Sequence, residues 1–212
     1  MERGGGASGA TSTTGRDTRT LARSLLDLCR MRKLKIATAE SCTGGLVAGA
    51  LTDIPGSSDV VDRGFITYSN DAKRAMLGVK ASTLDAFGAV SRETAIAMAV
   101  GALEAADVDL AVAITGIAGP GGATPGKPVG LVHFAVAARD GRIVAREKRF
   151  GAVGRTVVRQ LAVVEALRLL GELARGPGNG VKRPRPVAHR SRPRAARKPR
   201  QNAGTRRRTS RP

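Results

Sequence analysis

The sequence predicts an α/β fold, a single three-layer α/β/α sandwich with a mixed sheet. Short apolar runs alternate along the chain with segments of helical periodicity, the order that gives a sheet covered by helices. An Asp-Gly pair between two apolar runs, at residues 140–141, is a hairpin signal and adds an antiparallel pair. Because 42% of the residues are apolar, the chain can bury a core of ordinary size.

Five extended segments are expected to form the sheet. Residues 35–40, 59–69 and 108–115 are short apolar runs, and the last has the continuous apolar character of a strand buried on both faces. Residues 129–150 contain the other two strands, joined at the Asp-Gly turn. The expected sheet is therefore partly parallel and partly antiparallel.

Six segments carry apolar or small residues at three- and four-residue spacing and are expected to be helices. The first is expected to start at a cap provided by Asp17 or Thr18, and the second to stop before Pro55. The expected helices lie within residues 20–33, 41–54, 70–79, 81–88, 91–107 and 155–175.

Composition divides the chain into three parts. Residues 1–17 are expected to be a disordered leader, residues 18–175 the folded domain, and residues 176–212 a disordered Arg/Pro-rich tail. The tail holds 13 of the 36 basic residues and no acidic residue, so most of the net charge of +19 belongs to it. Such a tail can neutralise nucleic-acid phosphates, although without aromatic side chains it would bind non-specifically.

The sequence indicates a cytoplasmic protein without metal or other cofactor. The first twenty residues lack the apolar segment of a signal peptide, and no apolar run is long enough to span a membrane. The two cysteines, Cys29 and Cys42, cannot build a disulfide framework and do not have the spacing of metal ligands.

The stretch TAESCTGG, residues 38–45, is the first candidate for a functional site. Ser41 follows an expected strand and opens a helix, so it is either an ordinary helix cap or a nucleophile. Ligands of open α/β sheets bind beyond the carboxyl ends of the strands, where helix N-terminal amides stabilise negative charge. Cys42 is either a competing nucleophile or a small residue packed under the helix.

A serine nucleophile needs a base, and the sequence offers few. His189 lies in the tail, and His133 lies in an expected strand, where an ordinary strand side chain is the simpler interpretation. Lys73 follows the end of the second expected strand and so projects from the same side of the sheet as Ser41. A lysine with a lowered pKa serves as base in Ser-Lys hydrolases, whereas an ordinary solvated lysine is the alternative.

The glycine-rich segment 115–128, TGIAGPGGATPGKP, follows the third expected strand. Its free amides suit an anion such as a phosphate group. It does not have the pattern of a nucleotide-binding P-loop, because Pro128 follows the Gly126-Lys127 pair. A plain flexible connection is the alternative.

Five motifs, in the same order over about residues 21–170, resemble the C-terminal domain of the CinA (competence/damage-inducible) family. They are TAESCTGGLVAGALTDIPGSS, RGFITYSNDAKRAMLGV, GAVSRETA, AVAITGIAGPGG and KPVGLVHFAV. The resemblance implies a compact α/β/α domain, commonly self-associated and without metal. It also implies hydrolysis of nicotinamide mononucleotide to nicotinic acid mononucleotide and ammonia.

The resemblance places the family serine on Ser41 and the family lysine on Lys73, and Tyr68 is expected to assist them. Arg155 corresponds to the family arginine before the last helix, although its stretch FGAVGR lacks an acidic residue found in many members. Glu40 either contacts the substrate or braces the turn. The residues expected to bind the substrate are Glu40, Thr43, Gly44, Gly45, Asn70, Thr115, Gly116, Ala118, Gly119 and Arg155.

Two alternatives to the amidohydrolase remain at the level of the sequence. One is a member of the family that keeps the fold without the activity, against which the intact Ser41, Lys73 and glycine motifs argue. The other is a nucleic-acid-associated protein that acts through its basic tail.

Overall fold

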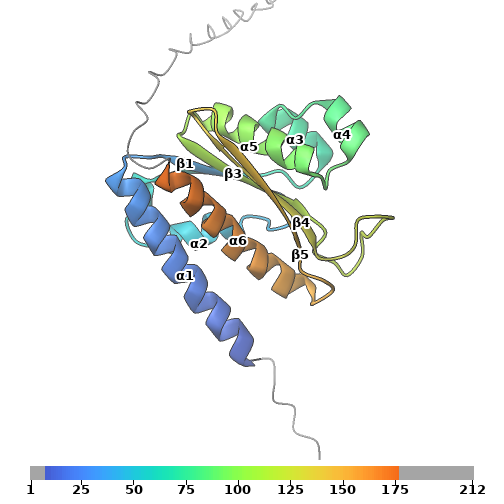
Figure 1. Ribbon diagram of the computed structural model, residues 1–212, viewed down its shortest axis with the longest axis horizontal. Coiled ribbons are helices and arrows are strands. Elements are labelled where there is room, and N and C mark those ends of the chain that lie inside the picture. The colour runs from blue at the N-terminus through green and yellow to red at the C-terminus, as the bar shows by residue number, and fades with distance from the viewer. Residues whose placement is uncertain (1–7, 177–212) are drawn as a thin grey trace, which may run out of the picture. The chain divides into compact units, whose positions relative to one another are not determined.

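The computed structural model describes residues 8–176 of the chain (Figure 1). The tail beyond Gly176 and the first seven residues lie outside the described residues, so the expectations for them stay predictions. Among residues 8–176, none of the helices combines the length and the apolar character that crossing a bilayer requires.

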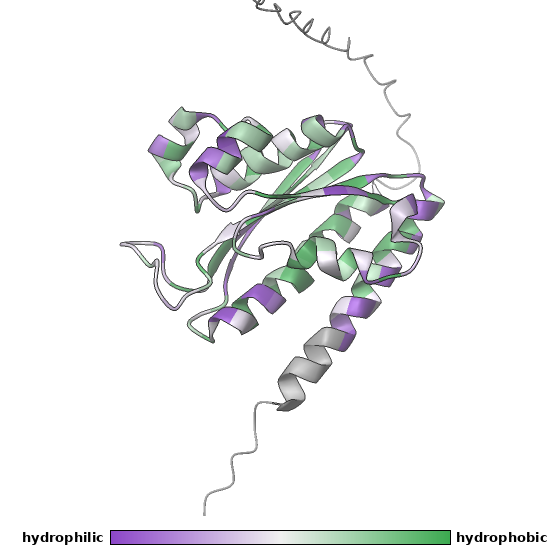
Figure 2. Cartoon of the chain, turned by 180° about the vertical axis from the view of Figure 1, so that it is seen from behind, coloured by the Kyte–Doolittle hydropathy of each residue, from purple (hydrophilic) through white to green (hydrophobic). Residues whose placement is uncertain are grey.

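A five-stranded mixed sheet forms the middle layer, as the sequence predicts. The strands are β1 (Ile36–Glu40), β2 (Val61–Ile66), β3 (Leu110–Gly116), β4 (Leu131–Ala138) and β5 (Ile143–Arg149). They lie in the order β2-β1-β3-β4-β5; β2, β1 and β3 are parallel, and β4 is antiparallel to both β3 and β5. Because β1 and β3 are central and buried on both faces, most of their residues are apolar (Figure 2), and Thr38 and Glu40 of β1 are buried polar residues.

Helices cover both faces of the sheet and make the three-layer sandwich (Figure 1). One face is covered by α1 (Ser8–Met31), α2 (Leu46–Thr52) and α6 (Arg155–Arg175). The other face is covered by α3 (Asn70–Leu77), α4 (Ala81–Phe87) and α5 (Arg92–Ala106), and a short 3₁₀ helix, η1 (Ser57–Asp59), precedes β2. Each face buries its own apolar cluster, so the α/β/α prediction is confirmed.

Helix α1 begins at Ser8, earlier than the expected cap at Asp17 or Thr18, so residues 8–17, expected to belong to a disordered leader, are helical instead. Leu25, Leu26 and Cys29 of its C-terminal half are buried in the core. Helix extension adds one backbone hydrogen bond for each residue fixed, whereas nucleation is costly. Because the C-terminal half is already helical and packed, extending the helix through the first turns costs no new nucleation, and no proline interrupts those turns.

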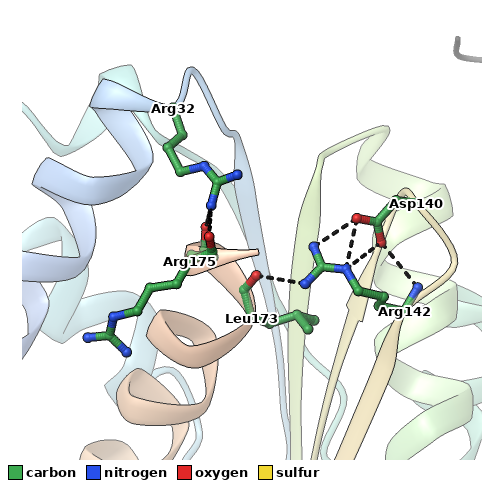
Figure 3. Close-up of polar contacts among 6 residues, drawn as sticks. Arg32, Asp140, Arg142, Leu173 and Arg175 are labelled. Atoms are coloured by element: carbon green, nitrogen blue, oxygen red, sulfur yellow. Dashed lines mark hydrogen bonds and ion pairs between the residues drawn. The ribbon is translucent and has the colours of Figure 1, made fainter. Parts of the chain in front are cut away.

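Two arginines from distant segments bind the C-terminal carbonyl groups of α6 (Figure 3). Arg32 donates to the carbonyl oxygens of Ala174, at 2.6 Å, and Arg175, and Arg142 donates to that of Leu173 at 3.2 Å. The last carbonyls of a helix have no partner within the helix, and cations there also complement its dipole. These contacts fix the end of α6 opposite to the one that reaches the candidate site.

Helices α3 and α5 approach each other so closely that position 101 of α5 requires glycine. A Cβ atom added at Gly101 would lie 1.9 Å from the carbonyl oxygen of Leu77, whereas one added at Gly49 of α2 would meet nothing within 4 Å.

We expect Gly101→Ala to lower the free energy of unfolding by about 1–3 kcal/mol or more through overpacking. The matched variant Gly49→Ala should leave stability unchanged or raise it by up to about 1 kcal/mol, because alanine is the better helix former. Thermal and urea denaturation measure both. Equal stability of the two variants would contradict this packing.

Candidate active site

Ser41 lies directly after β1, at the edge of the sheet where the three parallel strands end. Its amide donates to the carbonyl oxygen of Ile114 in β3 at 2.9 Å, which continues the ladder by one residue. Side chains alternate between the two faces along a strand. Ala37 and Ala39 belong to the cluster under α5, so Ser41 shares their face and Glu40 has the opposite one.

Lys73 reaches Ser41 from α3. Ser69 is the N-cap of this helix, and its hydroxyl accepts a hydrogen bond from the amide of Ala72 at 3.0 Å. Lys73 is only 1% exposed, and its Nζ lies 3.2 Å from Ser41 Oγ and 2.8 Å from the carbonyl oxygen of Thr67. The interpretation of Lys73 as an ordinary solvated lysine is therefore wrong.

The surroundings of Lys73 favour its neutral form. Burial lowers the pKa of the Lys73 ammonium from its usual 10.5, because the charged form loses its hydration. A thiolate at Cys42 would act in the opposite direction. Burial, however, raises the pKa of the Cys42 thiol to about 12, so this cysteine is protonated and unreactive at neutral pH.

The side chain of Glu40 caps the N-terminus of α2. It is fully buried, and α2 has a glycine, Gly45, at its N-cap position with no side chain to accept from its first amides. The Glu40 carboxylate supplies the acceptors instead, with hydrogen bonds from Gly45 N (3.0 Å), Val47 N (3.1 Å), Ala48 N (2.8 Å) and Thr38 Oγ1 (3.2 Å). Of the two roles left open for Glu40, the geometry favours bracing the turn.

Arg155 connects the segment after β2 to the glycine-rich loop. From the first turn of α6 it donates to the Tyr68 hydroxyl at 2.9 Å and to the carbonyl oxygen of Gly119 at 3.1 Å. The end of β2, the glycine-rich loop and the start of α6 thus meet at one guanidinium group. Tyr68 itself is 61% exposed and open to a ligand.

The remaining predicted residues lie around this edge of the sheet. Thr115 is buried and donates to the carbonyl oxygen of Ala89 at 2.7 Å, while Asn70 is exposed at the start of α3. Ala118 is buried in the core, and a Cβ at Gly116 would lie 2.7 Å from the carbonyl oxygen of Leu131. These positions therefore have structural roles of their own, and their contact with a substrate stays a prediction.

The turn after Ser41 contains two glycines with positive φ angles, Gly44 at 59° and Gly45 at 96°. Their close neighbours are protein side chains, Arg159 Nη2 and Ile66 Cδ1, at 3.4 and 3.1 Å from a Cβ built on each. Thr43 is fully buried, and its hydroxyl has no hydrogen-bond partner among residues 8–176. Such a group needs a water molecule or a ligand.

Arg159 is a residue of this site that the sequence analysis missed. It donates from Nε to the carbonyl oxygen of Cys42 at 3.1 Å and from Nη2 to that of Thr43 at 2.8 Å. The available signal was its position four residues after Arg155, which puts both arginines on one face of α6.

Two grooves of the described surface do not contain Ser41 or Lys73. One, of about 550 Å³, lies along α3 and the start of α4, and the other, of about 440 Å³, lies beside Phe87 and His133. His133 faces Glu147, with 3.7 Å between Nε2 and Oε2, and not Ser41. Burial lowers the pKa of His133. The candidate site is thus identified by its chemistry and not by the volume of a cavity.

The family model that describes the CinA C-terminal domain matches residues 18–174. The chain belongs to this family. It is 51% identical over 133 residues to the nicotinamide-nucleotide amidohydrolase PncC of Enterobacter agglomerans, a match that covers 63% of this chain and 80% of the relative. A CinA-like protein of Mycolicibacterium gilvum is 52% identical over 143 residues, 68% of this chain but 34% of that longer relative.

Solved structures agree with this family. The crystal structure of competence/damage inducible protein CihA from Agrobacterium tumefaciens superposes with a TM-score of 0.72 at 57% identity and covers 73% of this chain and 93% of the other.

We expect both thiols to resist modification in the folded protein at about pH 8, because burial suppresses their thiolates. Burial raises the pKa of Cys29 to about 11 and that of Cys42 to about 12. Titration with a thiol reagent should detect two cysteines only after denaturation in urea. Rapid labelling of Cys42 in the native protein would contradict this expectation and make Cys42 again a candidate nucleophile beside Ser41.

Proposed function

We propose that this protein hydrolyses the carboxamide of nicotinamide mononucleotide, giving nicotinic acid mononucleotide and ammonia. The carrying observation is the 3.2 Å separation of Lys73 Nζ and Ser41 Oγ in a buried setting. The relative named as a nicotinamide-nucleotide amidohydrolase supports the choice of substrate.

Ser41 acts as the nucleophile and Lys73 as its base. A neutral lysine has two N–H groups and one lone pair; one N–H donates to the carbonyl oxygen of Thr67, and the lone pair accepts the proton of Ser41. Ser41 Oγ then bonds to the carboxamide carbon. The proton passes from Lys73 to the amide nitrogen, and the C–N bond breaks to release ammonia.

Water completes the reaction. Lys73 takes a proton from a water molecule, whose oxygen attacks the acyl carbon attached to Ser41. Cleavage of the Ser41 ester, with return of the proton to Oγ, releases the carboxylic acid. The amide is thus exchanged for a carboxyl group at the expense of one water molecule, with no redox change.

Backbone amides of the turn stabilise the oxyanion in both steps. Glu40 already occupies the amides of Gly45, Val47 and Ala48, and the amide of Gly44 donates to the carbonyl oxygen of Ser41 at 3.1 Å. Among residues 8–176, the amides of Cys42 and Thr43 donate to no other residue, so these two are assigned to the oxyanion.

Arg155 binds the 5′-phosphate of the substrate. It is exposed, lies at the N-terminus of α6 and already bridges Tyr68 to the glycine-rich loop. A guanidinium group at a helix N-terminus combines a planar donor with the positive end of the helix dipole. Tyr68 and Asn70, both exposed at the same edge of the sheet, are assigned to orienting the pyridine ring and its carboxamide.

We expect Ser41→Ala and Lys73→Ala each to lower ammonia release from nicotinamide mononucleotide by at least about 1,000-fold, because each removes a group that reacts covalently or transfers a proton. Lys80→Ala is the matched control, since Lys80 is an exposed lysine at the N-cap position of α4 and its side chain makes no capping hydrogen bond. It should keep the activity of the unmodified protein.

A coupled assay for ammonia, with circular dichroism to verify folding, measures these effects. Near-normal activity in the Ser41 or Lys73 variant would contradict the mechanism. An inactive unmodified protein would instead favour a member that keeps the fold without the activity.

A further inference from the structure

Arg159 binds the turn that follows Ser41, and among residues 8–176 it forms no hydrogen bond with Ser41 Oγ or Lys73. Its two hydrogen bonds, 3.1 and 2.8 Å long, go to the consecutive carbonyl groups of Cys42 and Thr43. A planar guanidinium group binds two such acceptors in a fixed relative orientation, which a lysine cannot do. The contact connects α6 to a turn that is 116 residues away in sequence.

One peptide group, between Thr43 and Gly44, connects the Arg159 hydrogen bond to Ser41. The C=O of Thr43 and the N–H of Gly44 belong to the same planar trans peptide and point in opposite directions. Arg159 holds that C=O, and the N–H donates to the carbonyl oxygen of Ser41 at 3.1 Å. The orientation of the serine backbone is therefore coupled to the position of the guanidinium group.

The same argument applies to the preceding peptide. Arg159 holds the C=O of Cys42, which directs the N–H of Thr43 the opposite way. That N–H is one of the two amides assigned to the oxyanion. Gly44 makes the approach possible, because it adopts a φ of 59° and a Cβ there would already lie 3.4 Å from Arg159 Nη2.

Glu40 fixes the other end of the turn. Its carboxylate accepts from the amides of Gly45, Val47 and Ala48, so an anion holds the amide end while the Arg159 cation holds the carbonyl end. Helix α6 supplies a rigid base for Arg159, since Arg32 and Arg142 bind its far end.

We propose that Arg159 is a positioning residue of this site, which holds the Ser41 turn in the orientation that directs Ser41 Oγ to Lys73 and the Thr43 amide to the oxyanion. The role in turnover rests on the proposed amidohydrolase function. A displacement of about 1 Å at a reacting group can lower the rate about 100-fold.

The kinetic test compares Arg159→Ala and Arg159→Lys with Arg168→Ala, an exposed arginine of the same helix. For nicotinamide mononucleotide, we expect kcat to fall about 10- to 100-fold in both Arg159 variants, with KM changed less than about 3-fold. Added guanidinium ion should restore part of the kcat of Arg159→Ala and none of that of Ser41→Ala. Arg168→Ala should behave as the unmodified protein.

Two kinetic outcomes would overturn the proposal. A rise of KM with unchanged kcat would make Arg159 a substrate-binding residue. A loss of kcat that tracks a loss of folded protein, without rescue by guanidinium, would make its role merely structural.

Hydrogen exchange read by mass spectrometry needs no turnover and separates this proposal from the proposed function. Arg159→Ala should speed exchange in peptides that cover residues 41–48, while β3 and β4 exchange as before. If the unmodified protein releases no ammonia yet the turn loosens in this way, the amidohydrolase function fails and the positioning role stands. Unchanged exchange over residues 41–48 would overturn the positioning role.

Discussion

The contact between Lys73 and Ser41 is the interaction on which the candidate site, at the edge where the parallel strands end, depends. A lysine that is 1% exposed lies 3.2 Å from a serine hydroxyl, in surroundings that lower its pKa. Burying an ammonium group without a carboxylate partner is unfavourable, so the fold must hold Lys73 in place by other means. Helix α3, capped by Ser69 and packed closely against α5 at Gly101, provides that support.

Side chains alternate between the two faces of β1, and this alternation directs Glu40, which braces the turn, and Ser41, the proposed nucleophile, to opposite sides. Glu40 and Ser41 are neighbours in the chain, yet their side chains leave the strand on opposite faces. The carboxylate is thus kept for the amides of α2 and does not pair with Lys73, which would raise the lysine pKa. A single strand end therefore carries a carboxylate beside the nucleophile in sequence, while the hydrogen bonds of that carboxylate go to Thr38 and to amides of α2 and its N-terminal turn, and not to Lys73.

Sequence reasoning reached the parts of this site that depend on chemistry and strand order. The scarcity of usable histidines and the position of Lys73 after the second strand made Lys73 a candidate base for Ser41, because parallel strands end at the same edge. The resemblance to the CinA family then favoured this role over that of a solvated lysine. The alternation of elements likewise predicted the mixed sheet, and five separate motifs predicted the family.

Other parts could not be read in this way because they depend on how distant segments pack. The bracing role of Glu40 depends on which face of β1 its side chain leaves from, and the sequence does not show that this face is the one covered by α2. Arg159 binds carbonyl groups, which carry no sequence signal, in a turn distant along the chain. The early start of α1 at Ser8 depends on the packing of its other half, which local cap preferences do not register.

A direct titration of Lys73 tests the central claim most closely. The lysine signals of isotope-labelled protein can be followed by NMR over the alkaline range, with Lys73→Ala used to assign the one that belongs to this residue. The account predicts a Lys73 pKa clearly below the usual 10.5, while exposed lysines titrate near that value. A Lys73 pKa at or above 10.5 would contradict it, since the lysine would then be a charged group unable to accept the proton of Ser41.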